Sequence, residues 1–318
     1  MSNLFQKFCG SFHNGKMVNR PMLWIVIAIA ITAACMSGHA RSESLKSATP
    51  YPDAAGERFS VAVSGTGPDV ILIPGLASSA DVWNGTVDHL KGHYRLHVLN
   101  LAGFAGEPAG ANAQGDILVP AVEALDAYIK ANHLNRPVVV GHSMGGLMAL
   151  MLAKAHPEDA GKLVIVDALP YVGVIFNPAA TPATMAPQAT ALRDGLMATP
   201  DDAFAAQQSA SMGRMVTSAD NVKLVVKWSV DSNRRVFAES FYEDLMTDMR
   251  PDVAAIATPT TVLFPVAGGQ DAAQTEAFYR MSYTGMPKVS FTRIDNSLHF
   301  EMLDQPEAFY AAMDGALN

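Results

Sequence analysis

Short apolar runs alternate with longer segments of helical periodicity along most of this chain. The apolar runs predict strands over Arg58–Val63, Val70–Ile73, Arg95–Leu99, Val138–Val140, Leu163–Val166, Thr261–Val266 and Lys288–Ile294. The periodic segments predict helices over Ala80–Leu90, Asp116–His133, Met144–His156, Ala272–Tyr283 and Glu307–Leu317. Continuous apolar runs are typical of strands buried on both faces, and alternating strands and helices build parallel sheets. The pattern therefore predicts an α/β fold with a mostly parallel central sheet flanked by helices, in which the alternating run at Arg58–Val63 is an edge strand.

The alternation of strands and helices stops between Tyr171 and about Arg250. Four prolines (Pro178, Pro182, Pro187 and Pro200) predict an irregular first half for this segment. Helical patterns return over Asp201–Met212, Asn221–Val230 and Val236–Met249. We interpret residues 171–250 as a helical cap inserted between two sheet strands, so that residues 58–170 and 251–318 together form the core.

Two features of the cap have alternative interpretations. Six methionines fall in it, and core packing is the favoured explanation over an adaptable apolar wall for a substrate; they are Met185, Met197, Met212, Met215, Met246 and Met249. Arg234-Arg235 is interpreted as a solvated helix start rather than as a grip on a substrate carboxylate.

Residues 1–40 have the pattern of a signal peptide. A basic segment precedes the apolar run Met22–Met36, and Ser37–Ala40 supplies a small-x-small site. We expect cleavage after Ala40, a loose mature terminus over residues 41–57, and a periplasmic or secreted protein. A membrane-anchored protein is the alternative, either through an uncleaved segment or through lipidation at Cys35, where Thr32–Cys35 weakly resembles a lipoprotein box.

Composition narrows the possible chemistry of the mature chain. Both cysteines, Cys9 and Cys35, lie in the predicted signal peptide, so a cysteine nucleophile, a thiolate metal site and a disulfide are all excluded after cleavage. Without residues 1–40 the chain has 19 Lys and Arg against 30 Asp and Glu, a net charge of −11. This charge and the lack of a basic run make nucleic acid and anionic lipid surfaces poor partners.

The most informative motif is Gly141–Gly146, a G-x-S-x-G sequence between a predicted strand and a predicted helix. This context is the one that a nucleophile elbow requires, with Ser143 at the apex of a sharp turn. The glycines before and after Ser143 leave room for the turn. The amino end of the following helix has free N–H groups, which suit a developing oxyanion.

A serine needs a base and an orienting acid before it can attack a carbonyl carbon. His299 follows the last predicted strand and is the candidate base. Asp271 follows the strand Thr261–Val266 and is the preferred acid, because Ser143, Asp271 and His299 then fall in the chain order expected for this elbow. Asp167, at the end of the strand Leu163–Val166, is the alternative acid.

Two backbone N–H groups should stabilise the tetrahedral intermediate. Met144 N–H, directly after the nucleophile, is the first candidate. Leu76 N–H is the second, because Gly75 allows its loop to approach the serine closely. Gly75 and His142 are predicted to line the substrate pocket.

Together these residues resemble the α/β-hydrolase family, from roughly Arg58 to the carboxyl terminus. Two departures are visible: many members have His-Gly where this chain has Pro74-Gly75, and many have an Asp and a second histidine where it has Asn100–Phe104. Neither departure touches the triad, but both prevent any subfamily's substrate from being assigned. Ser143 at the apex argues against epoxide hydrolase and haloalkane dehalogenase chemistry, in which an aspartate attacks.

The resemblance implies an exported serine hydrolase that cleaves a carboxylic ester through an acyl-enzyme, without cofactor or metal, and acts on a small molecule. Amide, peptide or lactone hydrolysis, carbon–carbon bond hydrolysis and cofactor-free haloperoxidase chemistry remain alternatives on the same triad. A non-catalytic ligand-binding protein on the same scaffold is the alternative from another class.

Overall fold

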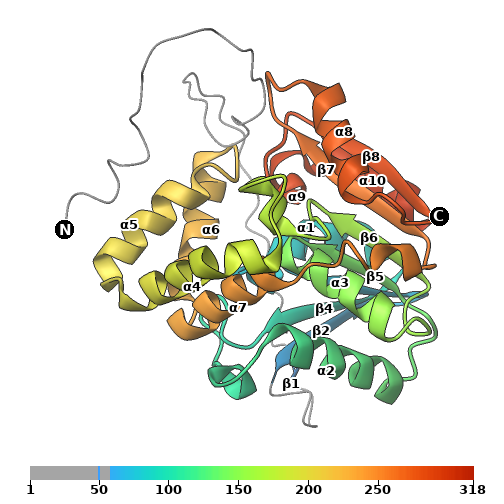
Figure 1. Cartoon of the computed structure of the whole chain (residues 1–318). Helices are drawn as coiled ribbons and strands as arrows, with labels where there is room; N and C mark the ends of the chain where they lie inside the picture. Colours follow the sequence, from blue (N-terminus) through green and yellow to red (C-terminus); the bar gives the residue numbers. More distant parts are fainter. Residues whose placement is uncertain (1–48, 51–57) are drawn as a thin grey trace, which may run out of the picture. The chain divides into compact units, whose positions relative to one another are not determined.

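A computed structural model of the chain describes residues 49–50 and 58–318, and its sheet is mostly parallel (Figure 1). In this part of the chain the sheet has eight strands in the order β1-β2-β4-β3-β5-β6-β7-β8. The strands are β1 Thr49–Pro50, β2 Phe59–Gly65, β3 Asp69–Ile73, β4 Arg95–Leu101, β5 Val138–His142, β6 Lys162–Val166, β7 Thr260–Val266 and β8 Val289–Asp295. β2 is antiparallel to both β1 and β4, and the six strands β4-β3-β5-β6-β7-β8 are parallel to one another. The predicted fold class is confirmed.

Helices cover both faces of the sheet, and the strand side chains alternate between them. Val70 and Leu72 of β3 pack into a cluster with α1 (Asn84–Leu90) and α10 (Pro306–Leu317). Ile71 and Ile73 pack into a second cluster with α2 (Leu118–Ala131), α3 (Met144–Ala155) and α8 (Ala272–Ser282). All four β3 side chains are fully buried, which explains why the strand is a continuous apolar run.

The segment between β6 and β7 contains four α-helices, which we call the inserted helices. They are α4 Pro182–Ala198, α5 Asp201–Met212, α6 Ala219–Asp231 and α7 Arg234–Met246. They pack with the sheet in one compact unit. A hydrogen bond of 2.8 Å from Met249 N–H to the Pro170 carbonyl joins the two ends of the insertion.

Helix α4 corrects the prediction that the first half of the insertion is irregular. Thr181 caps it with a capping box, and Pro182 follows at the first helical position, where no N–H is needed. Pro187 lies inside the helix and gives up one hydrogen bond. Met185 and Ala189, one turn apart, are buried against Tyr171 and Leu245, and this packing holds the helix despite the proline.

Most side chains singled out in the insertion have packing roles. Met185 and Met249 are buried and Met212, Met215 and Met246 pack against apolar clusters, whereas Met197 is exposed. The Arg234 guanidinium stacks 3.6 Å from the Phe204 ring centre and bonds the carbonyls of Leu196 and Thr199. Arg235 donates to the Asn112 and Gly115 carbonyls. The prediction of a helix start at Arg234-Arg235 is confirmed, because α7 begins at Arg234, but the prediction that both side chains are solvated is wrong, since both guanidinium groups hold backbone carbonyls.

Strand β2 is not an edge strand, because Thr49–Pro50 pairs with Ser60 and Val61 as β1. Thr49 and Pro50 also lie within residues 41–57, which were predicted to be a loose terminus. For these two residues the prediction is wrong, because they form a strand. The predicted signal peptide, its cleavage site and both cysteines lie outside the described residues.

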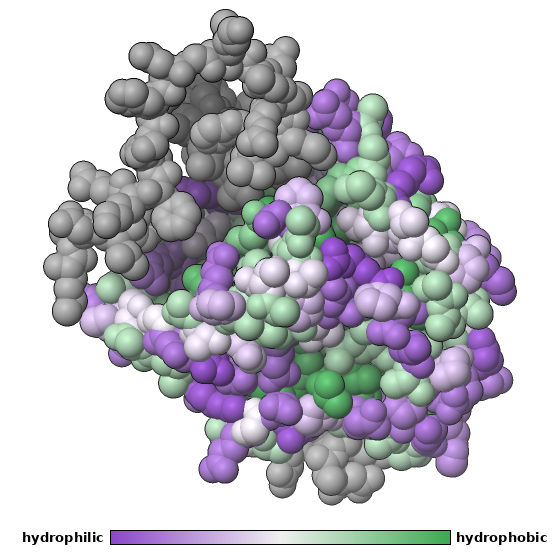
Figure 2. All heavy atoms as spheres, in the orientation of Figure 1, coloured by the Kyte–Doolittle hydropathy of each residue, from purple (hydrophilic) through white to green (hydrophobic). Residues whose placement is uncertain are grey.

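Within residues 49–50 and 58–318, no helix is both long and apolar enough to cross a bilayer. On the face drawn in Figure 2, hydrophilic and hydrophobic residues are interspersed.

Candidate active site

Ser143 is the single residue between β5 and α3, and its backbone conformation is one that few non-glycine residues adopt. Its φ is 53° and its ψ is −124°. A Cβ atom at Gly141 would lie 2.1 Å from the Gly145 carbonyl oxygen, and one at Gly145 would lie 2.5 Å from the Ile73 carbonyl oxygen. Only glycine fits these two positions, so the geometry is that of the predicted nucleophile elbow.

His299 lies in the loop between β8 and the short helix α9 (Glu301–Asp304), and its partner is Asp167. The distance from His299 Nδ1 to Asp167 Oδ2 is 2.6 Å. Asp167 directly follows β6, the strand next to β5, and has a φ of 40°. A proton on Nδ1 is donated to the carboxylate, which leaves Nε2 free to accept one.

Asp271, the preferred acid, does not reach His299 among the contacts of the described residues. It is the N-cap of α8, and its Oδ1 accepts hydrogen bonds from Ala273 N–H at 2.9 Å and Gln274 N–H at 3.2 Å. Asp271 lies five residues beyond the end of β7, in a loop that leads to the helix. The structure therefore replaces Asp271 with the alternative, Asp167, as the carboxylate that orients His299.

Tyr279 of α8 holds the other oxygen of this carboxylate, because its hydroxyl donates a hydrogen bond to Asp167 Oδ1. Burial and the charge of Asp167 raise the pKa of Tyr279 well above its usual value, so the hydroxyl keeps its proton. Sequence reasoning missed Tyr279. It is one aromatic residue on a correctly predicted helix, and its role depends on packing between distant segments.

His142 holds the backbone of His299. Its imidazole is fully buried, and Nε2 lies 2.8 Å from the His299 carbonyl oxygen. Burial and the nearby charge of His299 lower the pKa of His142 to about 3, so the ring is neutral and donates this hydrogen bond. These contacts make His142 a support for His299, whereas it had been predicted to line the substrate pocket.

Gly75 brings the β3 loop against the elbow. A Cβ atom at this position would lie 2.9 Å from His142 Nδ1 and 3.0 Å from Ser143 Cβ. Met144 is the first residue of α3, so its N–H has no acceptor within the helix. The next residue of the loop after Leu76, Ala77, has a φ of 55°. Leu76 and Met144 as oxyanion donors stay a prediction, and the contact at Gly75 supports it.

Glu301 is a buried carboxyl group next to this site. It is fully buried, and neither carboxyl oxygen has a hydrogen-bond partner among the residues that the structure describes. Burial, followed by the negative charges of Asp167 and Asp304, raises the pKa of Glu301 well above its usual value. The folded protein therefore holds a proton on Glu301 over a pH range in which the unfolded chain releases it.

We expect Glu301→Gln to stabilise the protein at alkaline pH. Because the pKa is raised in the folded state, wild-type stability is intact below the unfolded pKa and falls as pH rises above it. Glutamine removes this dependence, so the melting temperature of the variant should exceed that of the wild type by an amount that grows from acidic to alkaline pH. The exposed Glu107→Gln is the control. A constant difference across the pH series would contradict the assignment.

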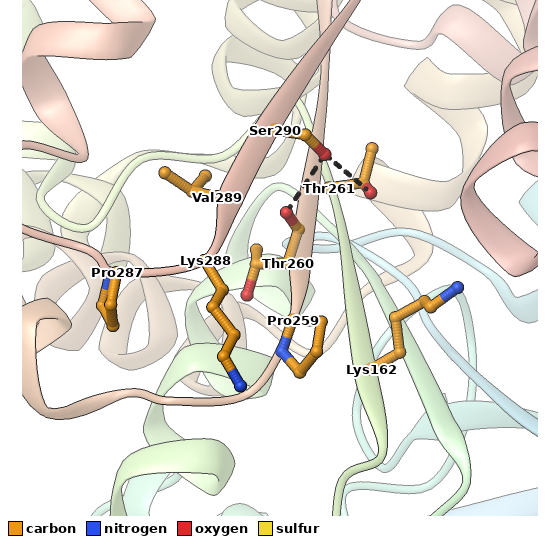
Figure 3. A pocket seen from close by; sticks show the side chains of 8 residues that line it. All are labelled: Lys162, Pro259, Thr260, Thr261, Pro287, Lys288, Val289 and Ser290. Atoms are coloured by element: carbon orange, nitrogen blue, oxygen red, sulfur yellow. Dashed lines mark hydrogen bonds between the residues drawn. The ribbon is translucent and has the colours of Figure 1, made fainter.

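Two other features lie away from this site. A pocket of about 240 Å³ lies at the opposite edge of the sheet, lined by Pro259, Thr260, Lys288, Ser290 and their neighbours (Figure 3). These residues are at the amino ends of strands, whereas ligands of open α/β sheets bind outside the carboxyl ends.

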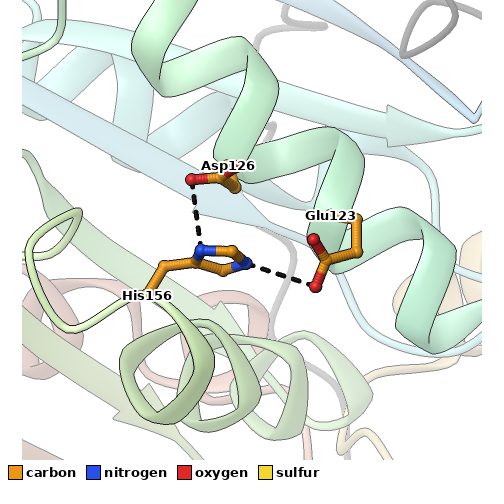
Figure 4. A group of neighbouring side chains, drawn as sticks. All are labelled: Glu123, Asp126 and His156. Carbon is orange, nitrogen blue, oxygen red and sulfur yellow. Dashed lines mark hydrogen bonds and ion pairs between the residues drawn. The ribbon is translucent and has the colours of Figure 1, made fainter.

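The second feature is a group of side chains with ligand atoms within 4.8 Å of one another: Glu123, Asp126 and His156 (Figure 4). His156 at the end of α3 contacts both carboxylates of α2, and Lys130 also pairs with Asp126. Sequence reasoning identified no metal-ligand cluster. The ion pairs explain this group as a link between the two helices.

The parallel sheet, the strained serine and the histidine–aspartate pair at the carboxyl ends of the strands define an α/β-hydrolase fold. Residues 70–312 match the Alpha/beta hydrolase family. The chain belongs to that family.

Known proteins also resemble the chain in sequence or in structure. Over 116 residues, 36% of this chain, it is 37% identical to the pimeloyl-[acyl-carrier protein] methyl ester esterase of Vibrio atlanticus. This match spans 42% of the relative, so the chain covers less than half the length of the curated relatives it matches.

Two solved structures illustrate the likeness in fold. A thermophilic esterase from Thermogutta terrifontis, solved with malate bound, has a TM-score of 0.68 at 18% identity and covers 84% of this chain and 96% of its own. The enol-lactonase from Burkholderia xenovorans has a TM-score of 0.65 at 18% identity and covers 81% of this chain and 96% of its own. At these identities the likeness concerns the fold.

Proposed function

We propose that this protein is a serine hydrolase that cleaves carboxylic esters, with Ser143 as nucleophile, His299 as base and Asp167 as acid. The observation that carries the proposal is the 2.6 Å contact between His299 Nδ1 and Asp167 Oδ2 beside a serine on a nucleophile elbow. Ser143 follows β5, Asp167 follows the adjacent strand β6, and His299 follows β8 at the same end of the sheet.

In the proposed reaction, the Ser143 hydroxyl oxygen attacks the ester carbonyl carbon while His299 Nε2 takes the hydroxyl proton. Asp167 stabilises the imidazolium, and Tyr279 keeps the carboxylate in place. The N–H groups of Leu76 and Met144 bind the oxyanion. His299 then returns the proton to the leaving alcohol, and a water molecule releases the acyl group by the same route.

An ester is the best-supported substrate class for two reasons. The relative from Vibrio atlanticus is named as a methyl ester esterase, and one structural neighbour is an esterase. An enol-lactonase shares the fold, so a cyclic ester is the second candidate. We also propose that the protein is exported to the periplasm or beyond, because residues 1–40 have the pattern of a signal peptide. Amino-terminal sequencing of the mature protein tests this part of the proposal.

A fluorophosphonate probe tests the nucleophile directly. We expect the probe to label the purified protein, and mass spectrometry of the digest to place the label on Ser143. The same preparation should hydrolyse short p-nitrophenyl esters, with lactones and amides as comparison substrates. An absence of labelling would favour a non-catalytic ligand-binding protein, and labelling at another residue would exclude Ser143 as the nucleophile.

A further inference from the structure

Helix α7 presents two buried polar side chains that have no hydrogen-bond partner in the described part of the chain. Ser240 is fully buried and its hydroxyl oxygen is unpaired. Asp244, one turn later, is 9% exposed, and no hydrogen bond or ion pair joins it to a described residue. Buried polar groups are nearly always paired, so two unpaired groups side by side require an explanation.

The side of α7 that carries Val236 and Glu243 is fixed against the core. Glu243 accepts hydrogen bonds at 2.8 Å and 2.7 Å from the N–H groups of Ile117 and Leu118, at the start of α2. Val236 packs against the backbone at Gly103. These contacts fix the rotation of α7 about its axis, and with it the direction of the neighbouring face.

That face carries Phe237, Ser240, Phe241 and Asp244, which are spaced i, i+3, i+4 and i+7 and lie along one stripe of the helix. Phe237 packs against Ala77 and Leu76 of the oxyanion loop. At the other end of the stripe, Asp244 lies within electrostatic range of His299. The stripe therefore runs beside the proposed catalytic groups.

We propose that Ser240 and Asp244 form a substrate-binding site for an ammonium group, so that the preferred substrate is an ester with a protonated amine on its acyl or alcohol part. This inference rests on the proposed function of the same site. An ammonium group supplies three hydrogen-bond donors, which the carboxylate and the hydroxyl oxygen accept. It also neutralises a buried charge that has no ion-pair partner among the described residues.

The electrostatics of Asp244 agree with this assignment. Burial raises the pKa of Asp244 to about 7, and the positive charge of His299 acts in the opposite direction. A bound ammonium group would compensate the cost of ionising Asp244. A methyl group in its place would leave both polar side chains unpaired, and a substrate carboxylate would repel Asp244.

The test is a panel of methyl esters of ω-amino acids of increasing chain length, each compared with its isosteric alkanoyl ester and with the matching dicarboxylate monoester. A parallel series places the amine on the alcohol part. Hydrolysis is followed by pH-stat. In wild-type protein we expect at least one ammonium ester to exceed its alkyl isostere in kcat/KM by about ten- to hundredfold, because a hydrogen bond to a charged group is worth that much.

Asp244→Asn should bring this ratio close to one and Ser240→Ala should lower it in part. Glu239→Gln, on the other side of the same helix, should leave it unchanged. The inference is overturned if no ammonium ester exceeds its isostere, or if Asp244→Asn slows all esters equally and keeps the ratio. Fluorophosphonate labelling of the same wild-type preparation separates this failure from failure of the proposed function, since labelling does not involve Asp244.

Discussion

Asp167→Asn should lower kcat for ester hydrolysis by about a thousand- to ten-thousandfold. Asparagine keeps the volume of aspartate but loses its charge, so it no longer stabilises the imidazolium of His299 and it favours the wrong tautomer. The contact that would be changed is the one between Asp167 Oδ2 and His299 Nδ1. Steady-state kinetics at several pH values measure the effect.

Asp271→Asn is the matched control for this experiment. Asp271 caps α8, and asparagine is as good an N-cap as aspartate. We therefore expect nearly wild-type kcat and a nearly unchanged melting temperature. If Asp271→Asn lost more activity than Asp167→Asn, the pairing seen in the structure would not be the catalytic one.

Ser143→Gly should abolish activity, with a loss of about a hundred-thousandfold or more in kcat, and yet be more stable than Ser143→Ala. Ser143 has a φ of 53°, a conformation that costs non-glycine residues about 1–3 kcal/mol. Alanine keeps this strain and glycine removes it, although glycine gives back about 0.5–1 kcal/mol in chain entropy.

Thermal unfolding of the two variants decides the second part of this prediction. The glycine variant should melt a few degrees higher, since about 1 kcal/mol corresponds to about 2–4 °C in a protein of this size. Both variants should lose the fluorophosphonate label. Equal melting temperatures would contradict the prediction, because they would mean that the strain at Ser143 does not exceed the entropy cost of glycine, about 0.5–1 kcal/mol.

The fold could be predicted because its strands are buried on both faces. Such strands appear in the sequence as unbroken apolar runs, as in Val70–Ile73, and need no knowledge of their partners. The elbow was predictable for a related reason. Ser143 and its glycines lie within six residues of sequence, and the turn they form is local.

The acid could not be decided in the same way. Asp167 and Asp271 both follow core strands, and both lie between Ser143 and His299 in the chain. Their positions in the sequence therefore do not decide which of them is the acid. The choice depends on which loop bends toward His299 and on which carboxylate caps a helix instead. Both depend on tertiary structure. Tyr279 was missed because a single tyrosine on a helix carries no local pattern. Asp244 was interpreted as a surface charge, which is wrong, because the structure buries it.

The hydrogen bond between Met249 N–H and the Pro170 carbonyl bears on how this protein could be re-engineered. It closes the insertion at its base, with Asp167 just outside it and all of α4–α7 inside. A chimera that exchanges the segment between these two residues would replace the inserted helices as one module. A crossover point even a few residues earlier would remove the carboxylate that orients His299. A chimera should therefore change its substrate range and keep its catalytic groups only if the exchange begins after Asp167.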